Sequence, residues 1–280
     1  MRDRVCLVTG ANSGIGLATT IGLARLGARV VMLCRDAARG AAARDRVRRD
    51  TGSEAVELLV ADLASFASVR AGADQLAARH PALHVLVHNA GVTTRRRQSS
   101  ADGLELTLAV NHLAPFLFTA LVAPLLRAGA PSRVVVVSSR VERVGRIDFD
   151  DLQSTRRYGS VRAYAQSKLA NVLFTYELAS RLSGSGVSAN CLHPGFVDTQ
   201  FMRETPAWLR ALWRSFLSTP EQGARTSLYL AASPLVDGVT GKYFEKVDRE
   251  RRSSRRSYDE GVRRRLWDVS AQLTGAPPLA

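Results

Sequence analysis

The sequence predicts an α/β fold built on a doubly wound parallel sheet of about seven strands, with helices on both faces. Short, continuously apolar runs such as RVVVVSS, residues 133–139, alternate with helical stretches along the 280-residue chain. Strands that are apolar on both sides are typical of a parallel sheet buried between two layers of helices. No linker rich in Ser, Gly or Pro interrupts the alternation, so we expect one domain over residues 1–280.

Seven apolar runs are the candidate strands, at about residues 4–10, 28–34, 55–61, 84–88, 133–139, 187–193 and 242–244. Helices are expected over about residues 14–26, 65–79, 101–127, 161–182 and 261–273. One more helix is expected to follow the second strand and end at about 48, and another to begin after 219. The helix after Thr219 carries a capping signature, with Pro220 at its first position and Gln222 three residues after the cap. The ligand crevice of such a sheet lies at the carboxyl ends of its strands.

The composition indicates a globular protein that works inside the cell. The N-terminus reads MRDRVCLVTG, without a signal-type apolar stretch, and no run approaches the roughly 18 apolar residues of a membrane span. The three cysteines, Cys6, Cys34 and Cys191, each lie in an apolar run, which favours reduced core residues over disulfides. We therefore expect a cytoplasmic protein with no membrane span, and leave peripheral contact with a membrane open.

The formal net charge is +14, from 39 basic and 25 acidic residues. Charge of this size can attract nucleic acid or an anionic surface. Neither of the arginine clusters, at 95–97 and 249–265, is interleaved with stacking aromatics, and no recognisable nucleic-acid module surrounds them. Arginine outnumbers lysine 36 to 3, which indicates a compositional preference spread over the surface. We expect no nucleic-acid partner and keep an arginine-driven binder of nucleic acid or anionic surfaces as an alternative.

The stretch TGANSGIG, residues 9–16, closes the first expected strand and opens the first helix. Its glycines allow a tight turn and a close backbone approach, and the free N–H groups of the helix start suit a pyrophosphate. The spacing differs from the commoner GxGxxG fingerprint, and an ordinary glycine-rich turn is the alternative. The strand before it and the helix after it favour a dinucleotide site in the first half of the chain, formed by Gly10, Asn12, Ser13, Gly14, Ile15 and Gly16.

The second expected strand ends in LCRD, residues 33–36. NAD-binding folds usually place an acidic residue here to hold the ribose 2′-hydroxyl, but this chain has Cys34 and then Arg35. A guanidinium suits a 2′-phosphate through paired hydrogen bonds, and Arg39 could assist from one helical turn further on. The pattern favours NADP(H), with NAD(H) as the alternative.

The sequence YAQSK places Tyr164 four residues before Lys168, one of only three lysines. On a helix the two side chains share a face. The ammonium group and an oxidised nicotinamide would both lower the pKa of Tyr164, which could then act as general acid/base at an alcohol or carbonyl oxygen. Ser139, at the end of the fifth strand, can hydrogen-bond that oxygen. An exposed surface pair is the alternative reading.

Taken together, the motifs resemble the short-chain dehydrogenase/reductase family over about residues 4–275. TGANSGIG is followed in order by HNAG (88–91), Asn111, SS (138–139), YAQSK and HPG (193–195). Three stretches are similar to its retinol-dehydrogenase-like branch, namely VNHLAPFLFT (110–119), the DLQS segment (151–154) and RRLWDVSAQLTG (264–275). The resemblance implies a Rossmann-type sheet with strand order 3-2-1-4-5-6-7 and hydride transfer to or from a lipophilic alcohol, aldehyde or ketone.

The resemblance also implies residue roles. Asn111 would kink its helix and hold a water that links Lys168 to solvent, and Ser139 rather than Ser138 would contact the substrate. Tyr164 and Lys168 would also contact the cofactor. Further implied cofactor contacts are Asp62, Leu63, Asn89, Ala90, Gly91, Pro194, Gly195, Val197 and Thr199. The family commonly reads NNAG, so His88 is a departure, for which we expect a structural role.

The substrate side is expected in a loop over about residues 195–219, before the last third of the fold. Its segment 200–218 is rich in aromatic and apolar residues and could form a lid, pack on the core, or contact a partner subunit or membrane. No metal is expected, since His80 and His84 flank Pro81 without a matching cluster of ligands.

The leading expectation is an NADP(H)-dependent carbonyl reductase or alcohol dehydrogenase, a monomer or homodimer. The alternative on the same fold is a non-catalytic NADP(H)-sensing regulatory protein. Such proteins tend to lose the Ser/Tyr/Lys set, which is complete in this chain.

Overall fold

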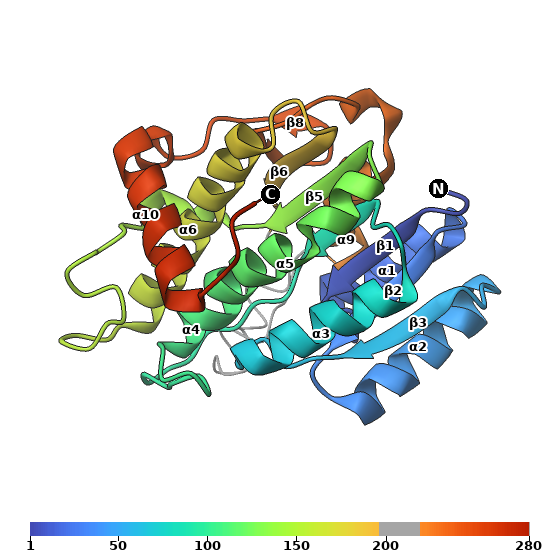
Figure 1. Ribbon diagram of the computed structural model, residues 1–280, viewed down its shortest axis with the longest axis horizontal. Helices are drawn as coiled ribbons and strands as arrows, with labels where there is room; N and C mark the ends of the chain where they lie inside the picture. The colour runs from blue at the N-terminus through green and yellow to red at the C-terminus, as the bar shows by residue number, and fades with distance from the viewer. Residues whose placement is uncertain (196–218, 280) are drawn as a thin grey trace.

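An eight-stranded sheet crosses the computed structural model, which describes residues 1–195 and 219–279 (Figure 1). The strand order is β3-β2-β1-β4-β5-β6-β7-β8, and β8 pairs antiparallel with β7 while the other neighbours pair in parallel. The strands are β1 (Val5–Thr9), β2 (Arg29–Cys34), β3 (Val56–Val60), β4 (Val85–His88), β5 (Ser132–Val137), β6 (Val187–His193), β7 (Tyr243–Glu245) and β8 (Arg249–Glu250). The predicted order of the first seven is confirmed. The two-residue β8 was not expected, because so short a strand leaves no pattern in the sequence.

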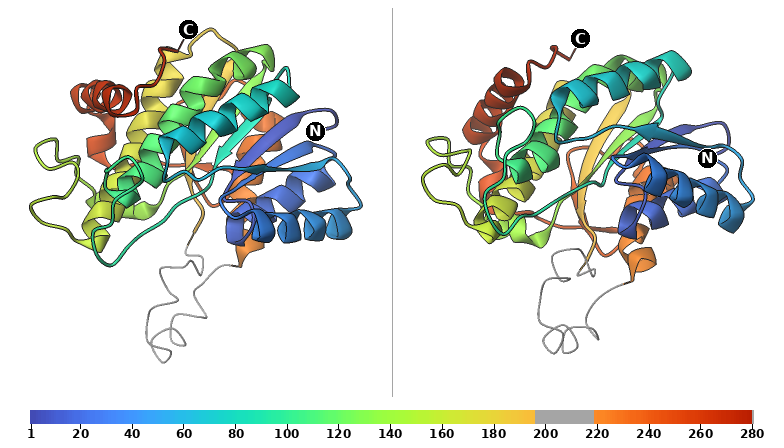
Figure 2. Two further views of the ribbon diagram at one scale, coloured as in Figure 1. Left: turned by 60° about the horizontal axis from the view of Figure 1, so that its bottom comes forward. Right: turned by 90° about the horizontal axis from the view of Figure 1, so that it is seen from below.

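Helices cover both faces of the sheet (Figure 2). The longer helices are α1 (Gly14–Arg25), α2 (Ala37–Thr51), α3 (Phe66–Arg79), α5 (Ala114–Ala128), α6 (Ser160–Arg181), α9 (Pro220–Ala232) and α10 (Glu260–Thr274). Shorter pieces are α4 (Leu106–Leu108), the π-helical η1 (Ala109–Leu113), and the 3₁₀ turns η2 (Arg140–Val144), η4 (Pro234–Val236) and η5 (Arg255–Tyr258). The expected capping box at Thr219 is present at the start of α9.

Two hydrophobic cores lie on opposite faces of the sheet. In β1, Leu7 belongs to the core under α3, α5 and α6, whereas Cys6 and Val8 belong to the core under α1, α2 and α9. All five residues of β1 are buried. This two-sided burial is why the strands are continuously apolar and do not alternate.

The carboxyl ends of the parallel strands lie along one edge of the sheet. Thr9, the last residue of β1, pairs with Leu33 in β2, and Val137, the last residue of β5, pairs with Leu192 in β6. The chain order reverses between β1 and β4, which are neighbours in the sheet. A crevice at this reversal is the usual ligand site of doubly wound sheets.

The long helix that includes α4, η1 and α5 differs from the sequence expectation in two ways. It begins at Leu106 rather than near 101, because the buried Glu105 carboxylate caps it by accepting bonds from Thr107 N and Leu108 N at 2.8 and 2.7 Å. Its span Leu106–Ala128 is also long and apolar enough for a membrane crossing, contrary to the expectation that no run approached that length. We overlooked it because Asn111 and His112 interrupt the apolar run. The protein buries 89% of its most apolar stretch, as expected for a core helix.

Helix α10 lies on the outside of α5 and α6 (Figures 1 and 2). Its Trp267 packs edge-on against Phe116 of α5, with ring centroids 4.7 Å apart, and stacks with Phe174 of α6 at 6.0 Å. The guanidinium of Arg181 lies 4.6 Å from the Trp267 ring centroid. This aromatic cluster attaches the C-terminal helix to α6.

We expect Trp267→Ala to lower the free energy of unfolding by about 3–5 kcal/mol, because the truncated side chain leaves a cavity between three helices. Urea denaturation followed by circular dichroism measures the change. Trp267→Phe should lower the free energy of unfolding by less, because a ring still fills part of the space. As a control, Leu235→Ala, at a residue 78% exposed, should change the free energy of unfolding by less than about 0.5 kcal/mol. An equal loss in the Leu235 control would contradict the assigned packing.

Candidate active site

The glycine turn between β1 and α1 is packed against the loop after β4. Gly10 and Gly14 have φ of +64° and +54°, a region that favours glycine. A Cβ on Gly16 would lie 2.3 Å from Gly10 O and 2.5 Å from Asn89 Nδ2, so only glycine fits there. Asn89 Nδ2 donates to Thr9 O at 2.9 Å, which ties the two loops together.

Thr9 is a positioning residue that sequence reasoning missed. Its hydroxyl oxygen accepts from the backbone N–H groups of Asn89 and Ala90, both at 3.0 Å. These bonds hold the HNAG loop beside the glycine turn. The threonine stands inside the quoted TGANSGIG motif, so the signal was present, but its partners are about 80 residues away.

The start of α1 offers hydrogen-bond donors to a ligand. Its N-cap residue Ser13 makes no side-chain capping bond, and the first turn holds no acidic residue. Ser13 and Gly14 are exposed, Asn12 and Ile15 are half-buried, and a Cβ on Gly14 would meet no atom within 4 Å. Unsatisfied N–H groups at an open helix start suit an anionic phosphate. The residues predicted for a dinucleotide pyrophosphate therefore fit that group.

The end of β2 presents a guanidinium at the predicted cofactor edge. Arg35 is exposed, and no carboxylate of residues 1–195 or 219–279 pairs with it. Arg39, which we expected to assist, pairs with Asp36 at 3.3 Å, while Asp36 also caps α2 by accepting from Arg39 N. Cys34 occupies the position of the usual acidic residue. It is buried, and burial raises the pKa of its thiol to about 11.

The predicted adenine contacts lie at the end of β3. Asp62 is half-buried and its Oδ1 accepts from Ala64 N at 2.9 Å, which forms the turn into α3. Leu63 is buried. Their place at the carboxyl edge, next to the end of β2 in the sheet, is compatible with the expected contact but leaves it a prediction.

Tyr164, Lys168 and Ser139 meet between α6 and the end of β5. The Ser139 side chain lies near that of Tyr164 and favours its ionised form, which lowers the tyrosine pKa. The ammonium of Lys168 donates to Val137 O at 3.0 Å and lies 5.5 Å from the centroid of the Tyr164 ring. A Cβ on Gly91 would lie 3.4 Å from Lys168 Nζ, so the HNAG loop borders the lysine. Ser138, in contrast, points to the helix, where its hydroxyl donates to Lys168 O at 2.8 Å.

Burial shifts the pKa values of two members of this trio. Burial raises the pKa of Tyr164 to about 12, and the nearby Ser139 hydroxyl only partly opposes this. Burial also lowers the pKa of Lys168 to about 8. The sequence expectation combined Lys168 with an oxidised nicotinamide, so the lowered pKa of Tyr164 stays a prediction for the cofactor-bound protein. Both groups are removed from water, and the ammonium lies 5.5 Å from the centroid of the Tyr164 ring.

Asn111 lies in the π-helical η1, where Ala114 N donates to Ala109 O and the regular α-helical pattern is interrupted. Both N–H groups of its amide are engaged, with Val92 O at 2.9 Å and Ser167 Oγ at 3.0 Å. Its oxygen accepts from Val92 N at 2.7 Å. The side chain thus connects the HNAG loop to the catalytic helix, and the expected water relay stays a prediction.

Ser167, inside YAQSK, is a second positioning residue that we missed. It is fully buried, accepts from Asn111 and donates to Tyr164 O at 2.8 Å. His88 is buried and pairs with Thr119 Oγ1 at 2.7 Å. Because Thr119 already donates to Pro115 O, the histidine must donate through Nε2, and burial lowers its pKa to about 3. A neutral, hydrogen-bonded His88 matches the structural role that we expected.

A partly buried ion pair joins the Ser139 turn to the far strands, which no sequence pattern indicated. Arg140 binds Glu245 of β7 through both carboxylate oxygens, at 3.1 and 2.8 Å. Its backbone N–H donates to Nδ1 of His193, at 3.3 Å, and burial lowers the pKa of that histidine to about 4. The pair joins Ser139 and the end of β6 to β7, although Arg140 and Glu245 lie 105 residues apart.

The predicted nicotinamide contacts are only partly described. Pro194 and Gly195 follow directly after β6 and are half-buried, with Gly195 at φ +91°. Val197 and Thr199 lie outside the described residues, as does the segment 200–218.

No group of three or more His, Cys, Asp or Glu gathers as metal ligands among the described residues. His80 pairs with Glu57 at 3.2 Å, and His84 Nδ1 accepts from Val5 N at 3.0 Å, so the two rings serve separate partners.

Known proteins are similar to this chain in sequence and in fold. Residues 4–210 match the family described as short chain dehydrogenase. Retinol dehydrogenase 14 of Homo sapiens is 44% identical over 294 residues, covering 98% of this chain and 87% of that protein. The solved structure of an uncharacterized protein from Mycobacterium paratuberculosis has a TM-score of 0.81 at 36% identity and covers 98% of this chain and 94% of its own. The Pseudomonas aeruginosa RhlG/NADP active-site complex has a TM-score of 0.73 at 28% identity, covering 87% and 94%.

The chain therefore belongs to the short chain dehydrogenase family, as the motif set predicted. It is an oxidoreductase of the NAD(P)-dependent short-chain dehydrogenase/reductase class, and it is similar to retinol dehydrogenases.

We expect Lys168→Met to stabilise the protein while abolishing activity. At pH 7 the free energy of unfolding should rise by about 1–3 kcal/mol, because the folded state no longer holds a buried ammonium. Asn171 Nδ2, at 3.4 Å, remains as a donor to Val137 O.

The effect should depend on pH in a defined direction. The pKa of Lys168 falls from 10.5 in the unfolded chain to about 8, so the wild type gains stability as pH rises from 8 to 10.5 and the gap to the variant shrinks. Urea denaturation at pH 7 and pH 10 measures this. Lys242→Met, at a surface pair with Glu250, is the control. If Lys168→Met is less stable than wild type at pH 7, the Lys168 ammonium is not an uncompensated, destabilising charge.

Proposed function

We propose that the protein transfers a hydride between NADP(H) and the carbonyl or alcohol carbon of a lipophilic substrate, with Tyr164 as general acid/base. The observation that carries the proposal is the meeting of Ser139, Tyr164 and Lys168 at the carboxyl end of β5, bordered by the HNAG loop. This trio lies at the same edge of the sheet as the glycine turn, across the β1–β4 reversal.

The residues at the start of α1 and at the end of β2 fit a dinucleotide that carries a 2′-phosphate. The open start of α1 would hold the pyrophosphate, and Arg35 would hold the 2′-phosphate through its forked donors. When bound, the nicotinamide supplies or accepts the hydride. The similar RhlG structure is an NADP complex, which supports the choice of NADP(H) over NAD(H).

Each member of the trio has a separate task. With its pKa raised to about 12, Tyr164 keeps its proton at neutral pH, which is the form that donates to a carbonyl oxygen during reduction. Ser139 lies near Tyr164 and can hydrogen-bond the same substrate oxygen. The Lys168 charge, held next to the ring, favours the tyrosinate once the proton has left.

The substrate class follows from the relatives. Retinol dehydrogenases 14 and 11 of Homo sapiens are 44% and 42% identical to this chain over nearly all of its length. We therefore propose a lipophilic alcohol, aldehyde or ketone. A screen of NADPH oxidation over aliphatic, aromatic, steroid, retinoid and polyketide-like carbonyls identifies the preferred compound.

Tyr164→Phe should lower kcat by about 10²- to 10⁴-fold, because the proton donor is lost. The dissociation constant of NADPH should stay within about twofold, since the phosphate contacts are distant from the hydroxyl. Steady-state kinetics and fluorescence titration of NADPH measure the two quantities. Tyr229→Phe, on α9 away from the trio, is the matched control. Full activity in Tyr164→Phe would refute the role, and NADPH binding with no turnover of any carbonyl by the wild type would favour the sensing alternative.

Arg35→Asp should shift cofactor preference toward NADH. We expect KM for NADPH to rise about 10- to 100-fold, because a charge-assisted contact becomes a repulsion. Arg49→Asp makes the same charge change at the exposed far end of α2 and should leave KM nearly unchanged. Equal effects of both variants would show a general field effect and exclude a 2′-phosphate contact at Arg35.

A further inference from the structure

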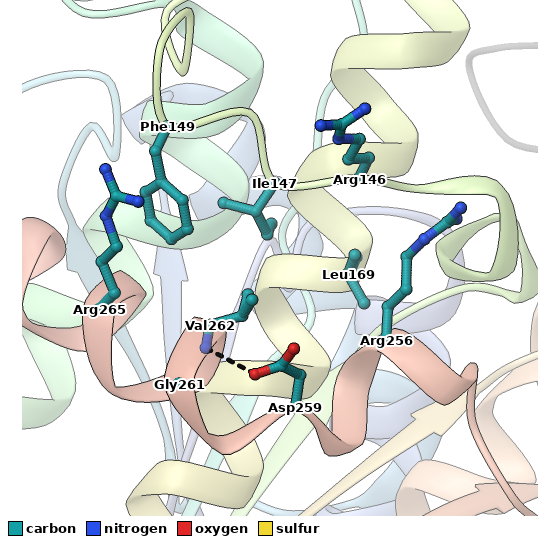
Figure 3. A pocket seen from close by; sticks show the side chains of 9 residues that line it. All are labelled: Arg146, Ile147, Phe149, Leu169, Arg256, Asp259, Gly261, Val262 and Arg265. Carbon is teal, nitrogen blue, oxygen red and sulfur yellow. Dashed lines mark hydrogen bonds between the residues drawn. The ribbon is translucent and has the colours of Figure 1, made fainter.

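A cavity of about 380 Å³ opens away from the catalytic trio, between the segment after η2, the middle of α6 and the start of α10 (Figure 3). Its size falls within the range of about 300–1,000 Å³ typical of small-molecule sites. None of the catalytic or cofactor residues named above lines it. The cavity therefore has no task in the proposed function.

The inner wall of the cavity is apolar. Ile147 and Leu169 line it and are 8% and 1% exposed, and Val262 and Phe149 complete the wall. These side chains come from three separate elements, and Figure 3 shows them around one opening. Such a wall can hold a hydrocarbon or aromatic body out of water.

Three arginines surround the opening. Figure 3 shows the guanidinium groups of Arg146, Arg256 and Arg265 toward the upper part of the view, with Asp259 at the lower part. Arg265 lies over the Phe149 ring at 4.1 Å, and Arg256 donates to Gly145 O at 3.0 Å. None of the three pairs with a carboxylate within residues 1–195 and 219–279.

The lining of the cavity carries more positive than negative charge. Other arginines of the same region are neutralised, such as Arg263 by Glu177 at 2.7 Å. Asp259 is the single acid of the lining, and its carboxylate caps α10 by accepting from Val262 N at 3.0 Å. Three guanidinium groups with one committed carboxylate leave the opening positive, which an anionic ligand would compensate.

We propose that this cavity binds an amphiphilic organic carboxylate. Its apolar body would lie against Ile147, Leu169 and Val262, and its carboxylate would accept hydrogen bonds from the surrounding guanidinium groups. This carboxylate site is separate from the site of hydride transfer, so it does not depend on the proposed function.

The site adjoins the elements that carry the catalytic residues. A Cβ on Gly145 would lie 2.4 Å from Ala165 O, so the segment that leads into the cavity is packed directly on α6 next to Tyr164. Leu169 follows Lys168 in the same helix. An occupant would contact the opposite side of the backbone that positions the trio.

Isothermal titration of the full chain with decanoate, below its micelle concentration and with saturating NADPH, tests the proposal. We expect saturable binding of one decanoate per chain, and much weaker binding of decanol, which lacks the charge, and of acetate, which lacks the body. The double variant Arg146→Gln/Arg265→Gln should weaken decanoate binding about tenfold or more, since charge-assisted bonds are lost. Val262→Phe should weaken it by filling the apolar part.

Arg255→Gln is the matched control, because this exposed arginine adjoins Arg256 but does not line the cavity. Three results would each overturn the proposal. The first is a failure of the decanoate test itself. Either decanoate shows no saturable binding to the wild type, or its binding is unchanged in both the double variant and Val262→Phe when circular dichroism shows these variants folded. The second is equal weakening by Arg255→Gln, which indicates non-specific charge attraction. The third is binding to anionic phosphatidylglycerol vesicles without binding of free decanoate, which indicates a membrane contact.

Discussion

The hydrogen bond from Lys168 Nζ to Val137 O is the constraint on which the site depends. It places an ammonium group inside the protein, and no carboxylate of the described residues pairs with it. An uncompensated buried charge is costly, so the two large cores on either side of the sheet must offset it. The surrounding bonds are arranged around this lysine: Ser138 fixes its backbone carbonyl, and Asn111 fixes the adjoining Ser167 to the HNAG loop. The enzyme thus stores electrostatic cost at the place where chemistry requires charge.

The scarcity of lysine gains a physical meaning from this arrangement. A chain with 36 arginines and 3 lysines uses lysine at the one buried site where a compact ammonium fits. A guanidinium carries five donors in a rigid plane, and the Lys168 site offers one carbonyl and one aromatic ring. Where the protein needs two parallel bonds to a carboxylate, as at Glu245, it uses Arg140. At these two sites the choice between lysine and arginine therefore follows the bond geometry that each site offers.

Much of the fold could be predicted because its determinants are local. Continuous apolar runs predicted the strands, the family resemblance predicted their order, and helix bounds such as Gly14–Arg25 differ from expectation by a residue or two. The trio was found because its residue types and spacing carry the chemistry. What escaped prediction depends on distant partners or on burial: the Glu105 cap, the Arg140–Glu245 pair, the contacts of Thr9, and the raised pKa of Tyr164. No window of sequence contains the solvent exposure that helps to set a pKa, so the effect of burial on Tyr164 was not part of the expectation.

Replacing the usual acidic residue at the end of β2 with Cys34 has a consequence for the reactivity of the enzyme. Thiols react with oxidants and alkylating agents as thiolates, and burial raises the pKa values of Cys6 and Cys34 to about 12 and about 11. Burial raises the pKa of Cys191 as well, and all three sulfurs are enclosed. At neutral pH each therefore stays a protonated, inaccessible thiol. The end of β2 thus carries a sulfur atom with almost no nucleophilic character. The folded protein holds no cysteine that an oxidant would readily modify near the nucleotide site.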